Sequence, residues 1–385
     1  MTYRCAECKG KGLCGRHPCP LKTRFEAQMN IKTTSGYMGQ APSVFIGSSG
    51  YPNVLSGPLM INSSDDPEEW VRRNLSIDEI VTARSQTIRG VEKTSVTSSF
   101  NEKLQEIALS SRAVEIEAAF EKPVTVEISY DGSIAPVGLS GYLSSMDVLG
   151  NASVERSVDK ATSDTDLPAT EAGFYLYQSD ISVHRITQLL STGMLGKKRR
   201  TVPTKWSITA TDDMIAGTLK KRISRYNELS SIEGFHTKFH GNTIAALLLP
   251  GPYSFEMVEI WKKGSLWSEN CDCIVRDGEG NKKTGYSPLQ GAYYSARLAA
   301  CEYLDRIKRC ARILIVRQVS GDYWAPLGTW VVREAARTSF SNKPSRFDTV
   351  EEGASAVSGV LGSNEWLNHS RMVEEIRTQK TLFDF

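Results

Sequence analysis

The chain has 385 residues, of which 40% are hydrophobic and 9% aromatic, so wholesale disorder is excluded and two or three globular domains are expected. Its 46 Lys and Arg residues oppose 44 Asp and Glu residues, which leaves a formal net charge of +2. That balance argues neither for nor against nucleic-acid binding, and any basic surface must be a local patch.

The chain shows neither a membrane span nor a secretion signal. Its longest apolar run, at 244–250, is far shorter than the roughly 18–20 residues that a bilayer requires. The first residues, Met1-Thr-Tyr-Arg-Cys5, lack the apolar middle of a signal peptide. We therefore expect a cytoplasmic protein, in which the eight cysteines are thiols or metal ligands rather than disulfides.

Four cysteines lie close together at the amino terminus in the pattern Cys-x2-Cys-x5-Cys-x4-Cys, with glycines between them. They are Cys5, Cys8, Cys14 and Cys19. Residues 1–24 are too poor in apolar side chains to form a core unaided, and four thiolates can hold a zinc ion tetrahedrally. The pattern predicts a structural zinc knuckle, with His17 as an alternative ligand. Redox thiols and unrelated cysteines remain the other interpretations.

Apolar periodicity and turn residues predict the elements of the first half of the chain. We expect a strand at 43–47, a helix at 65–75, a long helix at 101–121, a strand at 124–130, a surface loop at 151–170 and a strand at 173–178. The glycine-rich loops at 47–50 and 193–196 fit no dinucleotide or P-loop fingerprint and are interpreted as turns.

A basic and aromatic stretch follows in the middle of the chain. Nine basic and only two acidic residues lie between positions 197 and 225. The candidate ligands for nucleic acid or phosphate are Lys197, Lys198, Arg199, Arg200, Lys205 and Trp206. Lys and Arg neutralise phosphates, and an exposed Trp can stack on a base. The alternative is an ordinary solvated charged face.

Four residues near this stretch are candidates for catalysis. Asp212 and Asp213 follow a strand-like run at 206–210 and are suited to hold Mg²⁺ or Mn²⁺ for phosphoryl chemistry, although they also resemble a helix start. His236 and His240 would share one face if their stretch were helical. The alternative for both histidines is a polar cap or a place in the core.

The remaining elements mix helices and strands without a doubly wound pattern, which predicts an α+β (mixed α/β) fold. Strands are expected at 245–250, 254–261, 311–319 and 329–333, and helices at 288–309, capped by Ser287, and at 364–377. Cys271 and Cys273 are interpreted as half-buried structural thiols, and Cys301 and Cys310 as packing residues.

The last seven residues form a distinct tail with a glutamine, an aliphatic residue three positions later and aromatic residues after it. Its candidate partner-binding residues are Gln379, Leu382, Phe383 and Phe385. On one helical turn Leu382 and Phe385 share a side, as in peptides that dock in a hydrophobic pocket. The tail resembles the sliding-clamp (PCNA) interacting peptide, although the second terminal aromatic of the full motif is missing. The alternative is that the apolar residues fold back onto their own domain.

The order of these landmarks resembles the archaeal Nre family of proposed DNA-repair proteins. The matching segments are the cysteine knuckle, Ser49-Gly-Tyr-Pro-Asn-Val54, Gly196-Lys-Lys-Arg-Arg-Thr-Val-Pro-Thr-Lys-Trp-Ser207, Leu249-Pro-Gly-Pro-Tyr-Ser254 and the tail. The resemblance implies an archaeal cytoplasmic, nucleoid-associated protein that responds to DNA damage. It implies a knuckle at 1–24, an Nre amino-terminal domain at 25–270, an Nre carboxyl-terminal domain at 271–378 and a clamp-binding tail at 379–385. It supplies no reaction.

Three functions fit these observations. The leading hypothesis is a DNA repair protein that the sliding clamp recruits and that binds DNA or nucleotides through the central basic region. The first alternative is a metal-dependent nuclease or nucleotide phosphohydrolase. The second is a non-catalytic adaptor between the clamp and other repair proteins.

Overall fold

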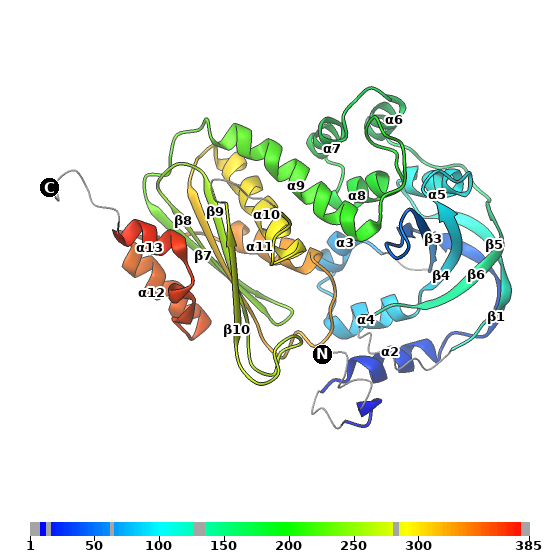
Figure 1. Ribbon diagram of the computed structural model, residues 1–385, viewed down its shortest axis with the longest axis horizontal. Helices are drawn as coiled ribbons and strands as arrows, with labels where there is room; N and C mark the ends of the chain where they lie inside the picture. The colour runs from blue at the N-terminus through cyan, green and yellow to red at the C-terminus, as the bar shows by residue number, and fades with distance from the viewer. Residues whose placement is uncertain (1–7, 13–16, 62–64, 127–134, 280–284, 379–385) are drawn as a thin grey trace. The chain divides into compact units, whose positions relative to one another are not determined.

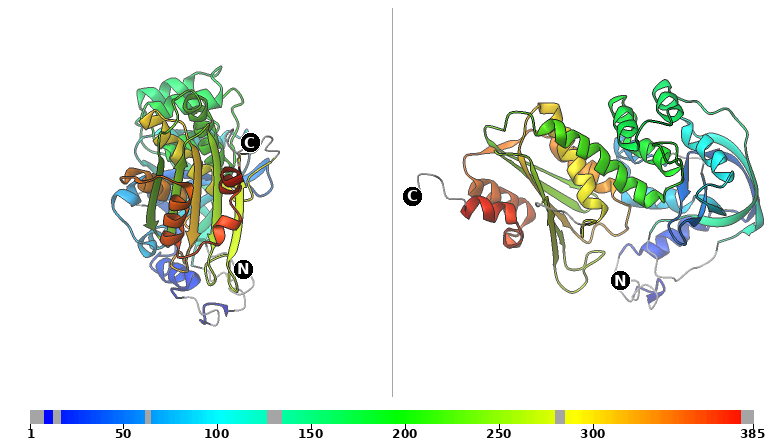
Figure 2. Two further views of the ribbon diagram at one scale, coloured as in Figure 1. Left: turned by 90° about the vertical axis from the view of Figure 1, so that its left-hand side faces the viewer. Right: turned by 45° about the horizontal axis from the view of Figure 1, so that its top comes forward.

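The computed structural model describes residues 8–12, 17–61, 65–126, 135–279 and 285–378 (Figures 1 and 2). The chain divides into two compact units: an amino-terminal unit, Met1–Ile215 with Ala325–Leu327, and a carboxyl-terminal unit, Ala216–Trp324 with Gly328–Phe385. Each unit has its own six-stranded sheet with helices packed on it, which confirms the expected mixture of helices and strands. None of the helices in these described ranges is long and apolar enough to serve as a membrane span.

The sheet of the amino-terminal unit is mostly antiparallel. Its strands lie in the order β1-β5-β6-β4-β3-β2, and β4 pairs with β6 in parallel. The strands are β1 (Thr34–Ala41), β2 (Ser43–Ile46), β3 (Asn53–Met60), β4 (Ile88–Ser95), β5 (Val114–Val124) and β6 (Leu139–Val148). The helices are α2 (Pro20–Gln28), α3 (Pro67–Arg72), α4 (Ile77–Ser85), α5 (Phe100–Leu109), α6 (Arg156–Ser163), α7 (Ala169–Gln178), α8 (Val183–Ser191) and the first part of α9 (Thr204–Ile223).

The long helix expected at 101–121 is wrong in its second half. The helix ends at Leu109, and β5 begins at Val114 after the Ser110-Ser111 turn. Val114 and Ala118 are four residues apart, a spacing that places side chains on one side of a strand as well as of a helix. The buried and exposed residues of β5 alternate, so the period of two prevails.

Three further expectations for this unit are wrong, in whole or in part. Residues 151–170 contain α6 rather than only a surface loop, because Val158 and Ala161 are spaced to bury one side of a short helix. Residues 173–178 belong to α7 rather than to a strand, with Ala172 and Leu176 buried one helical turn apart. A strand is also expected at 124–130. In the structure Val124 is the last residue of β5, residues 125–126 are in no strand, and residues 127–130 lie outside the described ranges.

The carboxyl-terminal unit has helices on both faces of its sheet. Figure 1 shows α10 and α11 on one face and α12 and α13 on the other. The strand order is β10-β9-β11-β8-β7-β12, with β9 and β11 parallel. The strands are β7 (Ile232–Phe239), β8 (Asn242–Leu249), β9 (Ser254–Trp261), β10 (Cys273–Gly278), β11 (Arg312–Val319) and β12 (Ser345–Phe347). The helices are the end of α9, α10 (Gly291–Ile307), α11 (Trp330–Ser341), α12 (Val350–Leu361), the 3-10 helix η1 (Glu365–Asn368) and α13 (Arg371–Thr378).

The strands expected at 245–250, 254–261 and 311–319 are confirmed, but three other expectations for this unit are wrong. The stretch expected as a strand at 329–333 begins helix α11. Gln290 rather than Ser287 precedes the first residue of α10. The last helix is broken into η1 and α13, because the buried Glu256 carboxylate accepts hydrogen bonds from the Ser370 hydroxyl and from the backbone N–H groups of Arg371 and Met372.

Candidate nucleic-acid interface

The exposed basic residues of the central stretch lie on one loop and on the helix that follows it. The loop connects α8 to α9 and carries Lys197, Lys198 and Arg200, all exposed. Lys205 and Trp206 lie in the first turn of α9 and are also exposed. The strand expected at 206–210 is wrong, since these residues are helical. The exposed cations of the loop therefore lie just before the amino-terminal end of a long helix, where backbone N–H groups favour anions.

The loop is folded tightly against the elements that precede it. The Val202 N–H donates to the Ser191 carbonyl at 2.8 Å, and the Thr201 N–H donates to the Val96 carbonyl at 3.2 Å. Gly193 has a φ of +76°, and a Cβ there would lie 2.6 Å from the carbonyl carbon of Arg200. Glycine is required at this position by both its left-handed backbone and the close approach of the chain.

Arg199, unlike its basic neighbours in the loop, is hydrogen-bonded to backbone carbonyls of the protein. Its guanidinium donates to the carbonyls of Thr162 at 2.9 Å and Asp164 at 2.8 Å, and also to that of Met194. Burial lowers the pKa of this guanidinium from its usual value, and the nearby Asp164 opposes that shift. Arg199 thus joins the loop to the end of α6, while Lys197, Lys198 and Arg200 remain exposed to solvent.

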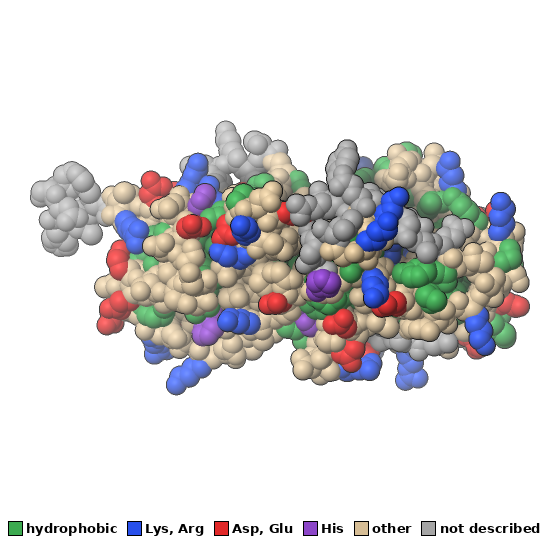
Figure 3. All heavy atoms as spheres, turned by 90° about the horizontal axis from the view of Figure 1, so that it is seen from below, with side chains coloured by type: hydrophobic (Ala, Val, Ile, Leu, Met, Phe, Trp, Pro, Cys, Tyr) green, Lys and Arg blue, Asp and Glu red, His purple; other side chains and the backbone are tan. Residues whose placement is uncertain are grey.

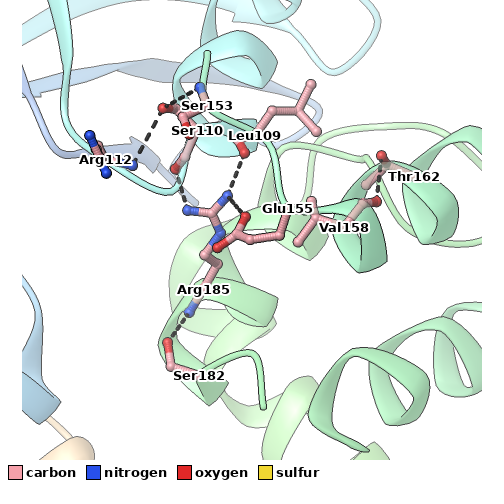
Figure 4. A network of polar contacts seen from close by, with 9 residues as sticks. All are labelled: Leu109, Ser110, Arg112, Ser153, Glu155, Val158, Thr162, Ser182 and Arg185. Carbon is pink, nitrogen blue, oxygen red and sulfur yellow. Dashed lines mark hydrogen bonds and ion pairs between the residues drawn. The ribbon is translucent and has the colours of Figure 1, made fainter. Parts of the chain in front are cut away.

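A second arginine fixes the helix from which the loop emerges. Figure 4 shows the Arg185 guanidinium of α8 directed at the carbonyls of Leu109 and Ser110, at the end of α5, and at Glu155. The Glu155 carboxylate lies 3.2 Å from the Arg185 Nη2 atom. Burial lowers the pKa of Arg185, and Glu155 opposes that shift. The carbonyls at a helix end lack intrahelical partners, so Arg185 satisfies them and ties α8 to α5.

An aromatic pair stands beside the basic loop. The rings of Trp206 and Tyr51 have centroids 5.2 Å apart and planes tilted by 56°. Tyr51 lies on the loop between β2 and β3, and the Ile46 N–H at the base of that loop donates to the Thr204 hydroxyl at 2.9 Å. Sequence reasoning missed Tyr51, because nothing local marks a residue 155 positions away as the neighbour of Trp206. Its signals in the sequence were its place in a loop rich in Gly, Ser and Pro and in the segment Ser49–Val54, one of those that carry the family resemblance.

The basic excess of residues 197–225 does not form one continuous patch. Lys220 forms an ion pair with Glu279, and Arg222 pairs with Asp305, both within the carboxyl-terminal unit. Figure 3 shows one face of the molecule, on which Lys and Arg side chains are scattered among Asp and Glu. The candidate interface is therefore the local group of Tyr51, Lys197, Lys198, Arg200, Lys205 and Trp206, which we call the loop–helix patch.

The four catalytic candidates do not share one element. Asp212 is fully buried and Asp213 exposed, both within α9. His236 is exposed on β7 and His240 lies in the following turn, so the helical arrangement considered for them is wrong. Four residues along a strand span roughly 13 Å, too far for two side chains to share one ion. Across the described ranges, no three His, Cys, Asp or Glu side chains gather as metal ligands.

His240 instead belongs to an aromatic cluster of the carboxyl-terminal unit. Its ring centroid lies 4.0 Å from that of Phe239 and 6.4 Å from that of Trp330. Burial lowers its pKa, which favours the neutral imidazole. His240 is half-buried, so its ring packs against these aromatic rings without being enclosed by the core.

The amino-terminal knuckle falls partly outside the described residues, which exclude Cys5 and Cys14. Cys8 is buried, Cys19 is half-buried and His17 is exposed. The Lys11 N–H donates to the Cys8 carbonyl at 2.8 Å, so the chain turns sharply after Cys8. Cys19 immediately precedes α2, which has a proline at its start. The described residues of this segment thus give a turn after Cys8 and a helix start after Cys19.

The other cysteines fall into two groups. Cys301 and Cys310 are buried, as expected, and burial raises the pKa of the Cys301 thiol to about 12. Cys271 and Cys273 are exposed, which corrects their expected half-burial. The Asp272 carboxylate between them accepts hydrogen bonds from Lys262 and from the Lys263 N–H, just before β10 begins at Cys273.

The predicted clamp-binding residues, Gln379, Leu382, Phe383 and Phe385, lie outside the described residues. Helix α13 ends one residue before them, at the exposed Thr378. The start of this helix is anchored by Glu256, whose carboxylate also accepts from Arg276 Nε at 2.7 Å. The last described helix is therefore fixed at its start by a buried carboxylate.

Comparison with known proteins identifies related sequences over the whole length. The family profile "Archaeal Nre, N-terminal" matches residues 13–268, and "Archaeal Nre, C-terminal" matches residues 279–385. The chain is 35% identical to DNA repair protein NreA of Archaeoglobus fulgidus (95% of this chain, 96% of that protein) and 34% identical to NreB of the same organism (99% of each). It is 32% identical to NreA of Haloferax volcanii (99% and 96%). No solved structure matches.

Proposed function

The chain belongs to the archaeal Nre family, whose relatives are named DNA repair proteins, and we propose that it repairs DNA as a clamp-recruited, DNA-binding factor. It would act in the cytoplasm at the nucleoid. Residues 379–385 would dock in a hydrophobic pocket of the sliding clamp, and the loop–helix patch would hold the DNA. The observation that most supports DNA binding is the gathering of four exposed cations at the start of α9 in a nearly neutral chain.

Charge reversal in the patch provides the test. In the variant Lys197→Glu/Lys198→Glu/Arg200→Glu, loss of three phosphate contacts should weaken DNA binding by at least about tenfold at low salt and should reduce the slope of log K against log salt by about 3. Fluorescence anisotropy with labelled DNA between low and physiological salt measures both quantities. The matched control is Lys221→Glu/Arg225→Glu/Lys238→Glu, three exposed cations outside the patch. Equal losses in both variants, or no DNA binding by the unchanged protein, would contradict the assignment.

We also propose that Cys5, Cys8, Cys14 and Cys19 hold one structural zinc ion. Four ligands close the coordination sphere, so the ion would order the segment before α2 and would not act on a substrate. Metal analysis of the purified protein should give about one zinc per chain, and Cys8→Ser/Cys19→Ser should lose it while Cys271→Ser/Cys273→Ser retains it. Full zinc content in the first variant would refute this site.

The described residues do not support the alternative of a metal-dependent nuclease or nucleotide phosphohydrolase. Asp212 is buried in the middle of a helix, and the two histidines lie on a strand and in a turn. We therefore place the candidate function in binding and recruitment rather than in hydrolysis.

A further inference from the structure

Two exposed aromatic side chains meet at the loop–helix patch although they come from segments far apart in the chain. Tyr51 keeps 39% of its surface exposed and Trp206 keeps 45%. Because the two ring planes are tilted by 56° rather than stacked, each ring covers only part of its neighbour. Large aromatic side chains normally bury most of their surface, so an exposed pair of this kind leaves ring area open to a flat ligand.

The pair is held in place by the backbone on both sides. The Thr204 hydroxyl accepts from the Ile46 N–H at 2.9 Å and lies 3.1 Å from the Ser191 hydroxyl. The loop that carries Tyr51 is closed by the bond from the Gly47 N–H to the Leu55 carbonyl, at 2.8 Å. Gly47 cannot be larger, since a Cβ there would lie 2.7 Å from that same carbonyl oxygen. Little conformational entropy of these two segments would therefore be lost when a ligand binds to the rings.

The charges around the pair are complementary to a phosphate chain. Neither segment that supplies the rings contains an Asp or Glu, from position 43 to 64 or from 181 to 211. Lys205 adjoins Trp206, and Lys197, Lys198 and Arg200 lie on the loop just before them. Open ring faces beside several cations and no carboxylate in the same segments are the arrangement that single-strand binding proteins use for bases and backbone.

We infer that Tyr51 and Trp206 form a base-stacking platform and that the loop–helix patch takes up single-stranded rather than duplex DNA; this inference rests on the DNA binding proposed above. In a duplex the base faces are covered by neighbouring base pairs, and only the phosphates and groove edges are accessible. An exposed aromatic ring adds affinity only when a base is unpaired. The substrates would be gaps, flaps or unwound ends.

The test compares the full-length chain on an oligothymidine of about 20 nucleotides and on a duplex of the same length, by fluorescence anisotropy. Tyr51→Ala and Trp206→Ala should each weaken single-strand binding by roughly 5- to 100-fold, the value of one lost stacking contact, with duplex binding changed less than about twofold. Tyr51→Phe and Trp206→Phe retain a ring and should retain most of the affinity. The matched control is Tyr142→Ala, an exposed tyrosine of β6 outside the patch.

The possible outcomes distinguish failure of the stacking platform from failure of the proposed DNA binding. Equal losses on single strand and duplex, or unchanged single-strand binding by Trp206→Ala, would overturn the stacking platform and leave DNA binding standing. Tighter binding of the unchanged protein to the duplex than to the oligothymidine would overturn the substrate class. Failure of the unchanged protein to bind any DNA at low salt would overturn the proposed function itself. If an alanine variant unfolds, Tyr51→Leu and Trp206→Leu keep an apolar side chain but remove the ring, and they should show the same selective loss of single-strand binding.

Discussion

Removal of residues 379–385 is expected to abolish binding to the sliding clamp and to shift the melting temperature by less than about 2 °C. The apolar anchors of a docked peptide supply most of its affinity, and the loss of one costs about 2 kcal/mol or more, a factor of about 30. The described part of the chain ends at the exposed Thr378, so the deletion leaves α13 complete. Pull-down on immobilised clamp and thermal unfolding measure the two effects.

A pair of point variants sharpens this test. Leu382→Ala/Phe385→Ala should lose clamp binding as fully as the deletion does, whereas Lys380→Ala/Thr381→Ala, in the same tail, should retain it. If the apolar residues instead pack on their own unit, truncating two of them would lower the free energy of unfolding by about 4–6 kcal/mol in total and leave the clamp unaffected. That result would replace the docking peptide with an internal staple.

Replacement of Glu256 by alanine should destabilise the carboxyl-terminal unit by about 3–5 kcal/mol. The side chain is 3% exposed, and its carboxylate accepts from Arg276, from the Ser370 hydroxyl and from two backbone N–H groups at the start of α13. Without it, the four donors lose their acceptor and the first turn of α13 loses its cap. Urea unfolding gives the free energy, and hydrogen exchange at residues 371–378 reports the release of the helix.

The matched control is Glu351→Ala. Glu351 also pairs with a residue of α13, Arg377, but the pair is exposed and its loss should cost less than about 1 kcal/mol. If the two variants are equally stable, the Glu256 network contributes nothing beyond an ordinary surface ion pair. Increased exchange confined to α13 in the Glu256 variant would show that the network acts on that helix first.

The sequence predicted best those elements whose two ends are marked by residues that interrupt regular structure. The strand expected at 254–261 is β9 without change, because its apolar run is bounded by prolines on one side and by charged residues on the other. Short apolar stretches were ambiguous, as at the start of α11, where Trp330, Val331 and Val332 suit a strand by propensity and are buried in a helix. Tertiary packing decided these cases, and packing is not local information.

For the candidate site, the sequence predicted the basic stretch but not the partners of its individual residues. The run from Lys197 to Trp206 indicated a basic surface without knowledge of the fold. The sequence could not show that Lys220 and Arg222 are used in ion pairs, or that Arg199 is turned inward to backbone carbonyls. These roles depend on partners brought together by folding, and charge counts along the chain cannot distinguish them from exposed cations.

Helix α9 passes from the amino-terminal unit into the carboxyl-terminal unit without a break, since the division falls between Ile215 and Ala216, inside its twenty residues. Cutting the chain there would interrupt a continuous helix between two of its buried residues, Ile215 and Leu219. Cutting between the two family regions, at 268–279, would split the antiparallel β9–β10 pair. Neither boundary is a flexible linker. A chimera that joins half of this chain to half of a relative at either point is therefore expected to disrupt α9 or the β9–β10 pair.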